Sequence, residues 1–168
     1  MSQMEELTRR SESGKAKMAA LAVAGVLGLA AALIVPWEGG RRETYADIVG
    51  VPTICFGHTA TARPGMVATE QQCRDLLTAD MLSHLAGIEH CIGTELEPHQ
   101  WAALLSWAFN VGTGAACGST LVRMINAGRP PEEWCHQLER WVYAGNKRVQ
   151  GLANRRQAEM ALCLGEGQ

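Results

Sequence analysis

The chain has 168 residues, 47% of them apolar, which is enough for one domain with a hydrophobic core and short for two. Its formal net charge of −2 lacks the positive excess of a nucleic-acid-binding domain, so we expect no nucleic-acid partner. Residues 18–35 comprise 16 apolar residues, two glycines and no charge. Apolar residues are therefore not distributed evenly along the chain, as they would be in a uniform soluble domain.

The first predicted element is hydrophobic, since Met18 to Trp37 are twenty residues without an ionisable side chain. A helix of about 20 residues spans the ~30 Å hydrocarbon core of a bilayer. Four basic residues precede it, Arg9, Arg10, Lys15 and Lys17. Basic residues beside a first hydrophobic segment tend to stay in the cytoplasm. We therefore predict a cytoplasmic lead over residues 1–17, a transmembrane signal anchor over 18–36 and an exported domain over 37–168.

Two other interpretations of this segment stay open. A secretory signal cleaved near Ala30-Ala31-Ala32 would release the domain, although cleaved apolar cores usually run about 7–15 residues. A buried helix of a soluble domain is the second. As an anchor the segment is weak, because half of residues 18–35 are alanine or glycine, and small side chains gain little from burial in lipid. Such a helix can leave the bilayer.

After the anchor, Pro36, Gly39 and Gly40 mark a joint. Residues 44–59 are then rich in β-prone side chains, punctuated by glycine and proline. This pattern predicts a small antiparallel hairpin or three short strands.

Helix signals dominate the rest of the chain. Thr69 with Gln72 forms a candidate capping box for a helix that ends near Ile88. Cap and periodicity signals predict four further helices, over residues 97–112, 119–128, 130–141 and 150–164. The predicted fold class is α+β, a mainly helical domain with a small antiparallel sheet near its N-terminus.

All six cysteines lie downstream of the apolar segment. An even number of cysteines in an oxidising compartment indicates disulfides, and six cysteines can pair in fifteen ways. Cys55-x2-His58 and His90-Cys91 do not form the paired spacing of a zinc site. We therefore expect neither a metal nor a cofactor.

Glu38, Asp47 and Thr53 carry chemistry that suits glycosidic hydrolysis. A carboxylic acid can protonate the leaving oxygen while a carboxylate and a hydroxyl position water against the anomeric carbon. Two acids nine residues apart are common by chance. Composition alone therefore leaves solvated surface carboxylates as the alternative.

Six ordered motifs surround and follow these residues: Trp37-Glu38-Gly39, Tyr45-x-Asp47-x2-Gly50, Thr53-x3-Gly57-His58-Thr59, Phe109-Asn110-Val111-Gly112, Trp141-Val142-Tyr143-Ala144-Gly145 and Gly151-Leu152-x2-Arg155-Arg156-x2-Glu159. Together they resemble the phage-type lysozymes, glycoside hydrolase family 24, whose active-site pattern is E-x8-D-x5-T. The spacing of Glu38, Asp47 and Thr53 matches that pattern at every step. The resemblance covers residues 37–164.

The resemblance implies hydrolysis of peptidoglycan between N-acetylmuramic acid and N-acetylglucosamine, with inversion. Glu38 would be the general acid, and Asp47 with Thr53 would hold the attacking water. For these roles Glu38 must stay protonated near neutral pH, which an apolar wall such as Trp37 favours, and Asp47 must stay ionised in a wetter hairpin. The implied fold is lysozyme-like, with a small β-containing lobe facing a helical lobe across a cleft.

Three supporting residues follow from the same motifs. Arg155 resembles the family arginine that pairs with the catalytic acid, with an exposed helix charge as the alternative. We expect His58 to satisfy hydrogen bonds in the hairpin rather than to transfer protons, and Asn110 to support the site from its motif. The resemblance also implies bridges Cys55–Cys73 and Cys135–Cys163, which leaves Cys91–Cys117.

A weak anchor joined directly to such a domain resembles the signal-anchor-release (SAR) endolysins. That group is exported by the host secretion machinery, is held inactive in the host inner membrane, and becomes active in the periplasm when the anchor escapes. Because Pro36 and Trp37 alone separate the apolar run 18–35 from Glu38, a membrane-held Glu38 should not face Asp47 correctly.

We therefore expect a monomeric endolysin that moves from the inner membrane to the periplasm. One alternative is an inactive membrane-anchored wall-binding or immunity protein that kept the lysozyme fold. The other is a secreted lysozyme with a cleaved signal peptide.

Overall fold

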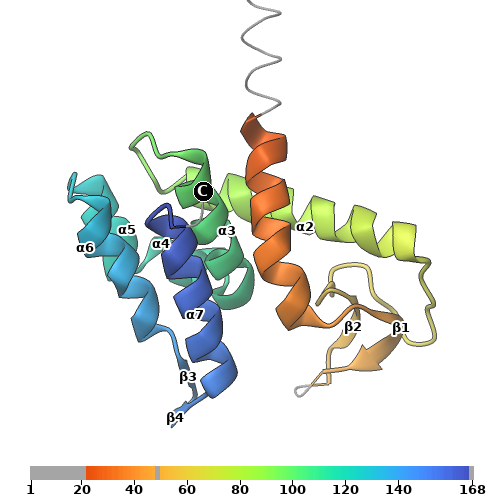
Figure 1. The fold of residues 1–168 in the computed structure, drawn as a ribbon. Helices are drawn as coiled ribbons and strands as arrows, with labels where there is room; N and C mark the ends of the chain where they lie inside the picture. Colours follow the sequence, from red (N-terminus) through yellow and green to blue (C-terminus); the bar gives the residue numbers. More distant parts are fainter. Residues whose placement is uncertain (1–21, 48–49, 167–168) are drawn as a thin grey trace, which may run out of the picture.

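The computed structural model describes residues 22–47 and 50–166 (Figure 1). The predicted cytoplasmic lead, residues 1–17, and the first residues of the predicted anchor, 18–21, lie outside the described residues. An N-terminal helix over residues 22–38 lies between a small sheet, formed by β1 (Arg41–Ala46) and β2 (Pro52–Cys55), on one side and α7 (Gln150–Cys163) on the other (Figure 1). The fold class is α+β and mainly helical, as predicted.

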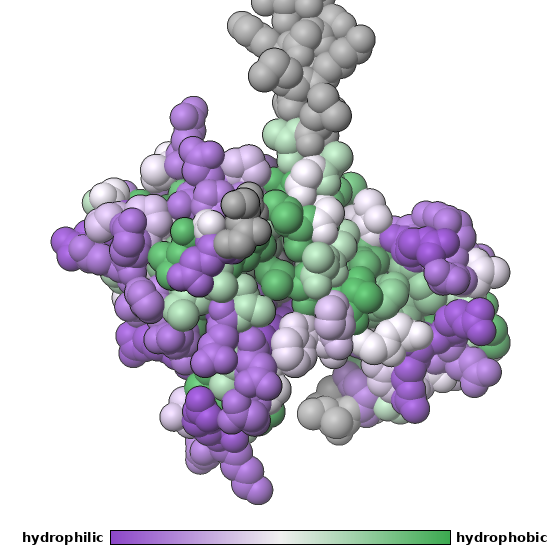
Figure 2. Space-filling model, in the orientation of Figure 1, coloured by the Kyte–Doolittle hydropathy of each residue, from purple (hydrophilic) through white to green (hydrophobic). Residues whose placement is uncertain are grey.

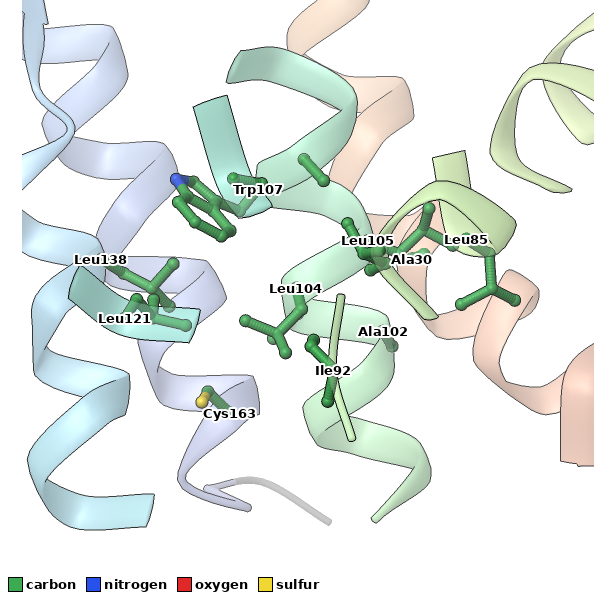
Figure 3. Close-up of a cluster of buried hydrophobic side chains, with 14 of the residues drawn as sticks. Ala30, Leu85, Ile92, Ala102, Leu104, Leu105, Trp107, Leu121, Leu138 and Cys163 are labelled. Carbon is green, nitrogen blue, oxygen red and sulfur yellow. The ribbon is translucent and has the colours of Figure 1, made fainter. Parts of the chain in front are cut away.

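One face of the N-terminal helix is buried in the domain. Val26, Ala30 and Ile34 are four residues apart, a spacing that places them on one side of a helix, and all three are buried. They belong to the main hydrophobic cluster, in which Ala30 lies with Leu85 and Leu105 (Figure 3). In this structure one face of residues 22–36 of the predicted anchor is therefore part of the domain core.

The opposite face of this helix is exposed and still apolar. Figure 2 shows hydrophobic residues along the helix at the centre of this side of the molecule, with hydrophilic residues on both flanks. Val23, Val35 and Trp37 are the large exposed side chains of the helix. Within residues 22–47 and 50–166, no helix has the length and apolar character needed to cross a membrane.

The joint after the helix begins later than predicted. The helix continues through Pro36 and ends at Glu38, directly before Gly39. Proline beyond the first turn lacks the N–H for the i−4 bond and crowds that carbonyl, which is why a break was expected there. The predicted break at Pro36 is therefore wrong, and Glu38 is a helical residue.

The predicted antiparallel hairpin is confirmed. It consists of β1 (Arg41–Ala46) and β2 (Pro52–Cys55), in which Tyr45 pairs with Thr53. Two isolated bridges extend it, Glu43 with Val67 and Ile54 with His58. The first strand begins at Arg41, earlier than the β-prone segment that the sequence indicated.

The helical part begins with the predicted cap. Thr69 accepts from the backbone N–H of Gln72 at 3.2 Å and donates its own N–H to the Gln72 side chain at 2.7 Å, which is a complete capping box. The helices are α2 (Glu70–Glu89), α3 (Pro98–Val111), α4 (Thr113–Cys117), α5 (Thr120–Asn126), α6 (Pro131–Cys135) and α7 (Gln150–Cys163).

Three short elements differ from the prediction. The helix expected over residues 130–141 stops at Cys135 and continues as a 3-10 helix over His136–Arg140. Helix α4 and a second hairpin, β3 (Tyr143–Ala144) with β4 (Lys147–Arg148), were not predicted. Each contains only two to five residues, too few for a helical or strand period to be recognised.

Three disulfides join the domain, Cys55–Cys73, Cys91–Cys117 and Cys135–Cys163. These are the pairs that the resemblance implies. They connect β2 to α2, the end of α2 to α4, and α6 to α7. The N-terminal helix contains no cysteine, so no disulfide ties it to the rest of the domain.

Candidate active site

Glu38 is the last residue of the N-terminal helix and lies about one turn after the buried Ile34. Its Oε1 accepts a hydrogen bond from Arg155 Nη1 at 2.7 Å. Its Oε2 lies beside Gly57, where an added Cβ would stand 3.3 Å from this oxygen. The carboxyl group is thus held between α7 and the turn that follows β2.

Arg155 is fixed by all three nitrogens of its guanidinium. Besides the bond to Glu38, its Nε donates to Glu159 Oε1 at 3.2 Å and its Nη2 donates to the backbone oxygen of Ser106 at 3.1 Å. The Arg155 side chain is 4% exposed and that of Glu38 is 22% exposed. Arg155 is therefore a buried ion-pair partner of Glu38, and its alternative interpretation as an exposed helix charge is wrong.

A second buried ion pair lies behind Arg155. Arg156 and Glu159 are both 0% exposed, with Arg156 Nε 2.7 Å from Glu159 Oε2. Ser106 Oγ donates to Glu159 Oε1 at 2.7 Å. Burial raises the pKa of Glu159 above its ordinary value, against the opposing effects of Arg156, Ser106 and Arg155. Burial likewise lowers the pKa of Arg156, which the nearby Glu159 opposes.

The sequence did not identify the Ser106 contact. Ser106 and Glu159 are 53 residues apart, and no local pattern connects them. Glu159 belongs to the C-terminal motif, but its spacing gave no role. A charged residue inside an otherwise apolar helix face is the signal that marks a buried partner of this kind.

Asp47 and Thr53 both bind the backbone of Val51 in the hairpin. The Val51 N–H donates to Asp47 Oδ1 at 2.8 Å, and the Asp47 N–H donates to the Val51 oxygen at 3.0 Å. The Thr53 hydroxyl donates to the same Val51 oxygen at 3.0 Å. Thr53 is buried and Asp47 is half-buried. The first hairpin therefore orders a carboxylate and a hydroxyl around the backbone of one residue, Val51.

His58 lies in the hairpin with both ring nitrogens engaged. Its Nδ1 is 2.8 Å from Asp80 Oδ2, and its Nε2 accepts from the Thr61 backbone N–H at 3.2 Å. Because Nε2 is an acceptor, the proton of the neutral ring belongs on Nδ1, facing Asp80. His58 thus links the hairpin to α2.

Two other expected contributors lie at exposed positions. Asn110 is exposed, one residue before the end of α3. Trp37 is 41% exposed, and the apolar wall expected from Trp37 beside Glu38 stays a prediction. In the part of the chain that the structure describes, no group of three His, Cys, Asp or Glu could hold a metal ion.

Comparison with known proteins gives consistent matches. Residues 35–159 match the phage lysozyme family. A SAR-endolysin of Bacteriophage PS119 is 41% identical over 128 residues, which cover 76% of each chain. The muramidase domain of SpmX from Asticaccaulis excentricus has a TM-score of 0.74 at 31% identity, covering 84% of this chain and 95% of that one.

The active form of P1 phage endolysin Lyz has a TM-score of 0.73 at 26% identity, covering 87% of this chain and 93% of that one. The family match includes the end of the N-terminal helix, the hairpin and α7 as far as Glu159, which are the segments that carry the candidate site residues. The chain therefore belongs to the phage lysozyme family, as a glycoside hydrolase and an endolysin of the SAR type.

Proposed function

We propose that this chain cleaves the β-1,4 bond between N-acetylmuramic acid and N-acetylglucosamine in peptidoglycan, with Glu38 as the general acid. The observation that supports this role is the fixed position of the Glu38 carboxyl between Arg155 and Gly57. In the protonated state of Glu38 that acts as the acid, Arg155 donates to Oε1 and the transferable proton is therefore on Oε2. That proton passes to the glycosidic oxygen as its bond to the anomeric carbon breaks.

Asp47 and Thr53 direct the attacking water. The Thr53 hydroxyl gives its own hydrogen to Val51, so its oxygen is available to accept a hydrogen bond from the water. Asp47 takes the water's other proton, and the water oxygen attacks the anomeric carbon from the face opposite Glu38. The product is inverted. Solvent then returns a proton to Glu38 and removes one from Asp47.

Replacement of Glu38 tests the catalytic assignment. Glu38→Gln keeps the shape of the side chain and cannot deliver the proton, so we expect lysis of permeabilised Gram-negative cells to fall by about 10²–10⁴-fold. The matched control is Glu132→Gln, an exposed carboxyl of α6 that should keep wild-type activity. Equal lysis by Glu38→Gln and wild type would overturn the assignment.

Before release, the host secretion machinery exports the chain and residues 18–36 tether it to the inner membrane. The same helix cannot lie in a bilayer and pack its Val26, Ala30 and Ile34 in the domain core. Docking after release therefore completes the core and carries Glu38, on the next helical step, to Arg155. The released enzyme acts in the periplasm as a monomer, because one chain supplies every proposed catalytic residue.

Fractionation of the full chain tests the tether. We expect a full-length chain first in the inner membrane and later in the soluble periplasm, with lower peptidoglycan cleavage per molecule in the membrane fraction. A released chain that has lost its N-terminus would support a cleaved signal instead. Equal specific activity in the two fractions would contradict activation by release.

A further inference from the structure

The catalytic proposal gives no role to the ion pair behind Arg155. Arg156 and Glu159 are fully buried, at 2.7 Å between Arg156 Nε and Glu159 Oε2, and neither contacts Glu38 in the described structure. Ser106 from α3 completes this group by donating to Glu159 Oε1. We call Ser106, Arg155, Arg156 and Glu159 the buried polar cluster.

Stability alone is a poor reason for such a cluster. Desolvating charged groups is costly, and a buried ion pair replaced by apolar side chains of similar volume is often neutral or stabilising. Since α3 and α7 pack closely in the surrounding core, apolar residues would fit the same environment. The presence of charged groups in the buried polar cluster therefore needs an explanation other than stability.

That reason lies in the orientation of Arg155. A guanidinium that binds only Glu38 through Nη1 would remain able to rotate about this bond. The second bond, from Nε to Glu159 Oε1 at 3.2 Å, sets the plane of the guanidinium, and the third, from Nη2 to the Ser106 oxygen, closes the fork. Glu159 in turn is held by Ser106 at 2.7 Å and by Arg156.

The charges around Glu38 are balanced by the same group. Arg155 and Arg156 from α7 face the carboxyls of Glu159 and of Glu38, which the N-terminal helix supplies. Helix α3 contributes the neutral Ser106, and Gly57 of the hairpin turn is uncharged. Removing Arg156 and Glu159 together thus leaves the net charge near Glu38 unchanged and alters only the support of Arg155.

We infer that Glu159 is a positioning residue for the lysozyme reaction: held by Ser106 and Arg156, it fixes the plane of Arg155 and through it the carboxyl of Glu38. This inference rests on the proposed role of Glu38 as the acid. Arg156 keeps the charge of Glu159 compensated, so that the carboxylate can be buried beside Arg155.

A matched pair of double variants separates positioning from stability. Arg156→Met with Glu159→Met replaces the ion pair by apolar side chains and removes the acceptor for Arg155 Nε. Arg156→Met with Glu159→Gln has the same charge but keeps an amide oxygen that can accept from Ser106 and Arg155. The measurements are kcat and KM on soluble peptidoglycan strands, with thermal unfolding of each full-length chain.

We expect the Met/Met variant to unfold within a few degrees of wild type and to lose about 10–100-fold in kcat, because a small misplacement of a reacting group is costly. Its KM should change by less than about twofold, since uniform substrate binding is untouched. The Met/Gln variant should recover at least about fivefold of the lost kcat. Equal kcat in the two variants would overturn the inference.

If the Met/Met variant does not fold, Glu159→Asp in the otherwise unchanged chain provides the test. It keeps the charge and withdraws the carboxylate from Arg155 by one methylene, so a folded Glu159→Asp enzyme with wild-type kcat would equally overturn the inference. Glu38→Gln distinguishes the two proposals. Loss of activity in Glu38→Gln with full activity in the Met/Met variant refutes the positioning role alone, whereas full activity in Glu38→Gln refutes the catalytic proposal.

Discussion

At the scale of single residues, the absence of a side chain at Gly57 matters as much as the presence of one at Glu38. The backbone of Gly57 has a φ of +82°, and a Cβ placed there would stand 3.3 Å from Glu38 Oε2. Contacts that short are tighter than most side chains adopt, so the carboxyl or the turn would have to shift. Gly57 therefore serves both the turn after β2 and the room for the acid.

Gly57→Ala should lose more activity than a substitution that strains the backbone equally but lies elsewhere. Gly65 has a φ of +81° with nothing within 4 Å of an added Cβ, so Gly65→Ala introduces the same backbone strain away from Glu38. We expect both variants to lose about 1–2 kcal/mol of stability. Only Gly57→Ala should also lose about tenfold or more in lytic activity, because it displaces Glu38. Equal activity of the two purified variants would show that the Gly57 contact is not functional.

At the scale of elements, the N-terminal helix performs two tasks with one face. Its spacing of four residues places Val26, Ala30 and Ile34 in the core, and the next step along that spacing is Glu38. Packing of the helix therefore sets the position of the proposed acid. A substitution that disturbs this packing should therefore displace Glu38 and lower activity, although the substituted residue lies about two helical turns from Glu38.

Ala30→Leu tests this coupling. Ala30 is 0% exposed, and a larger side chain in a filled core costs about 1–3 kcal/mol, so the helix should pack less well and activity should fall. Ala32→Leu adds the same apolar group on an exposed position of the same helix. Thermal unfolding and lysis by the purified full-length variants provide the comparison. The coupling is wrong if Ala30→Leu loses stability but no more activity than Ala32→Leu.

At the scale of the whole molecule, none of the three disulfides includes the helix that carries Glu38. The three disulfides join β2, α2, α4, α6 and α7 within the described structure. The N-terminal helix is held by noncovalent contacts, chiefly its buried face and the ion pair from Glu38 to Arg155. Under the proposed release from the membrane, this helix can therefore dock on the domain without a disulfide being formed or broken.

The balance between bilayer and core can be shifted without disturbing the docked helix. Gly25 and Gly28 have nothing within 4 Å of an added Cβ, so leucines there should not clash in the docked state. Each leucine adds apolar surface, and burial of this surface in lipid is favourable by ~25 cal/mol per Å². The double variant Gly25→Leu with Gly28→Leu should therefore keep more of the protein in the membrane fraction and delay lysis. Alanines at both positions are the control. Unchanged release kinetics of the leucine variant would contradict the weak-anchor proposal.

Local signals explain which parts of the fold could be predicted. The Thr69–Gln72 capping box and the hairpin of β1 and β2 depend on residues close in sequence, so their patterns are readable directly. Helix α4 and the β3–β4 hairpin are too short to show a period. The ion pair of Glu38 with Arg155 joins residues 117 apart, and only the resemblance suggested it.

Two features can be predicted from the sequence: residues 18–36 are uncharged and largely apolar, and Glu38, Asp47 and Thr53 follow with the spacing of a known catalytic pattern. The sequence did not determine which surroundings the apolar helix occupies in the folded domain. Transfer of apolar side chains from water is favourable whether they enter a bilayer or a protein core, so composition does not distinguish the two locations. The folded domain shows the helix in the protein core, because Val26, Ala30 and Ile34 pack against helices distant in sequence. This packing places Glu38 beside Arg155.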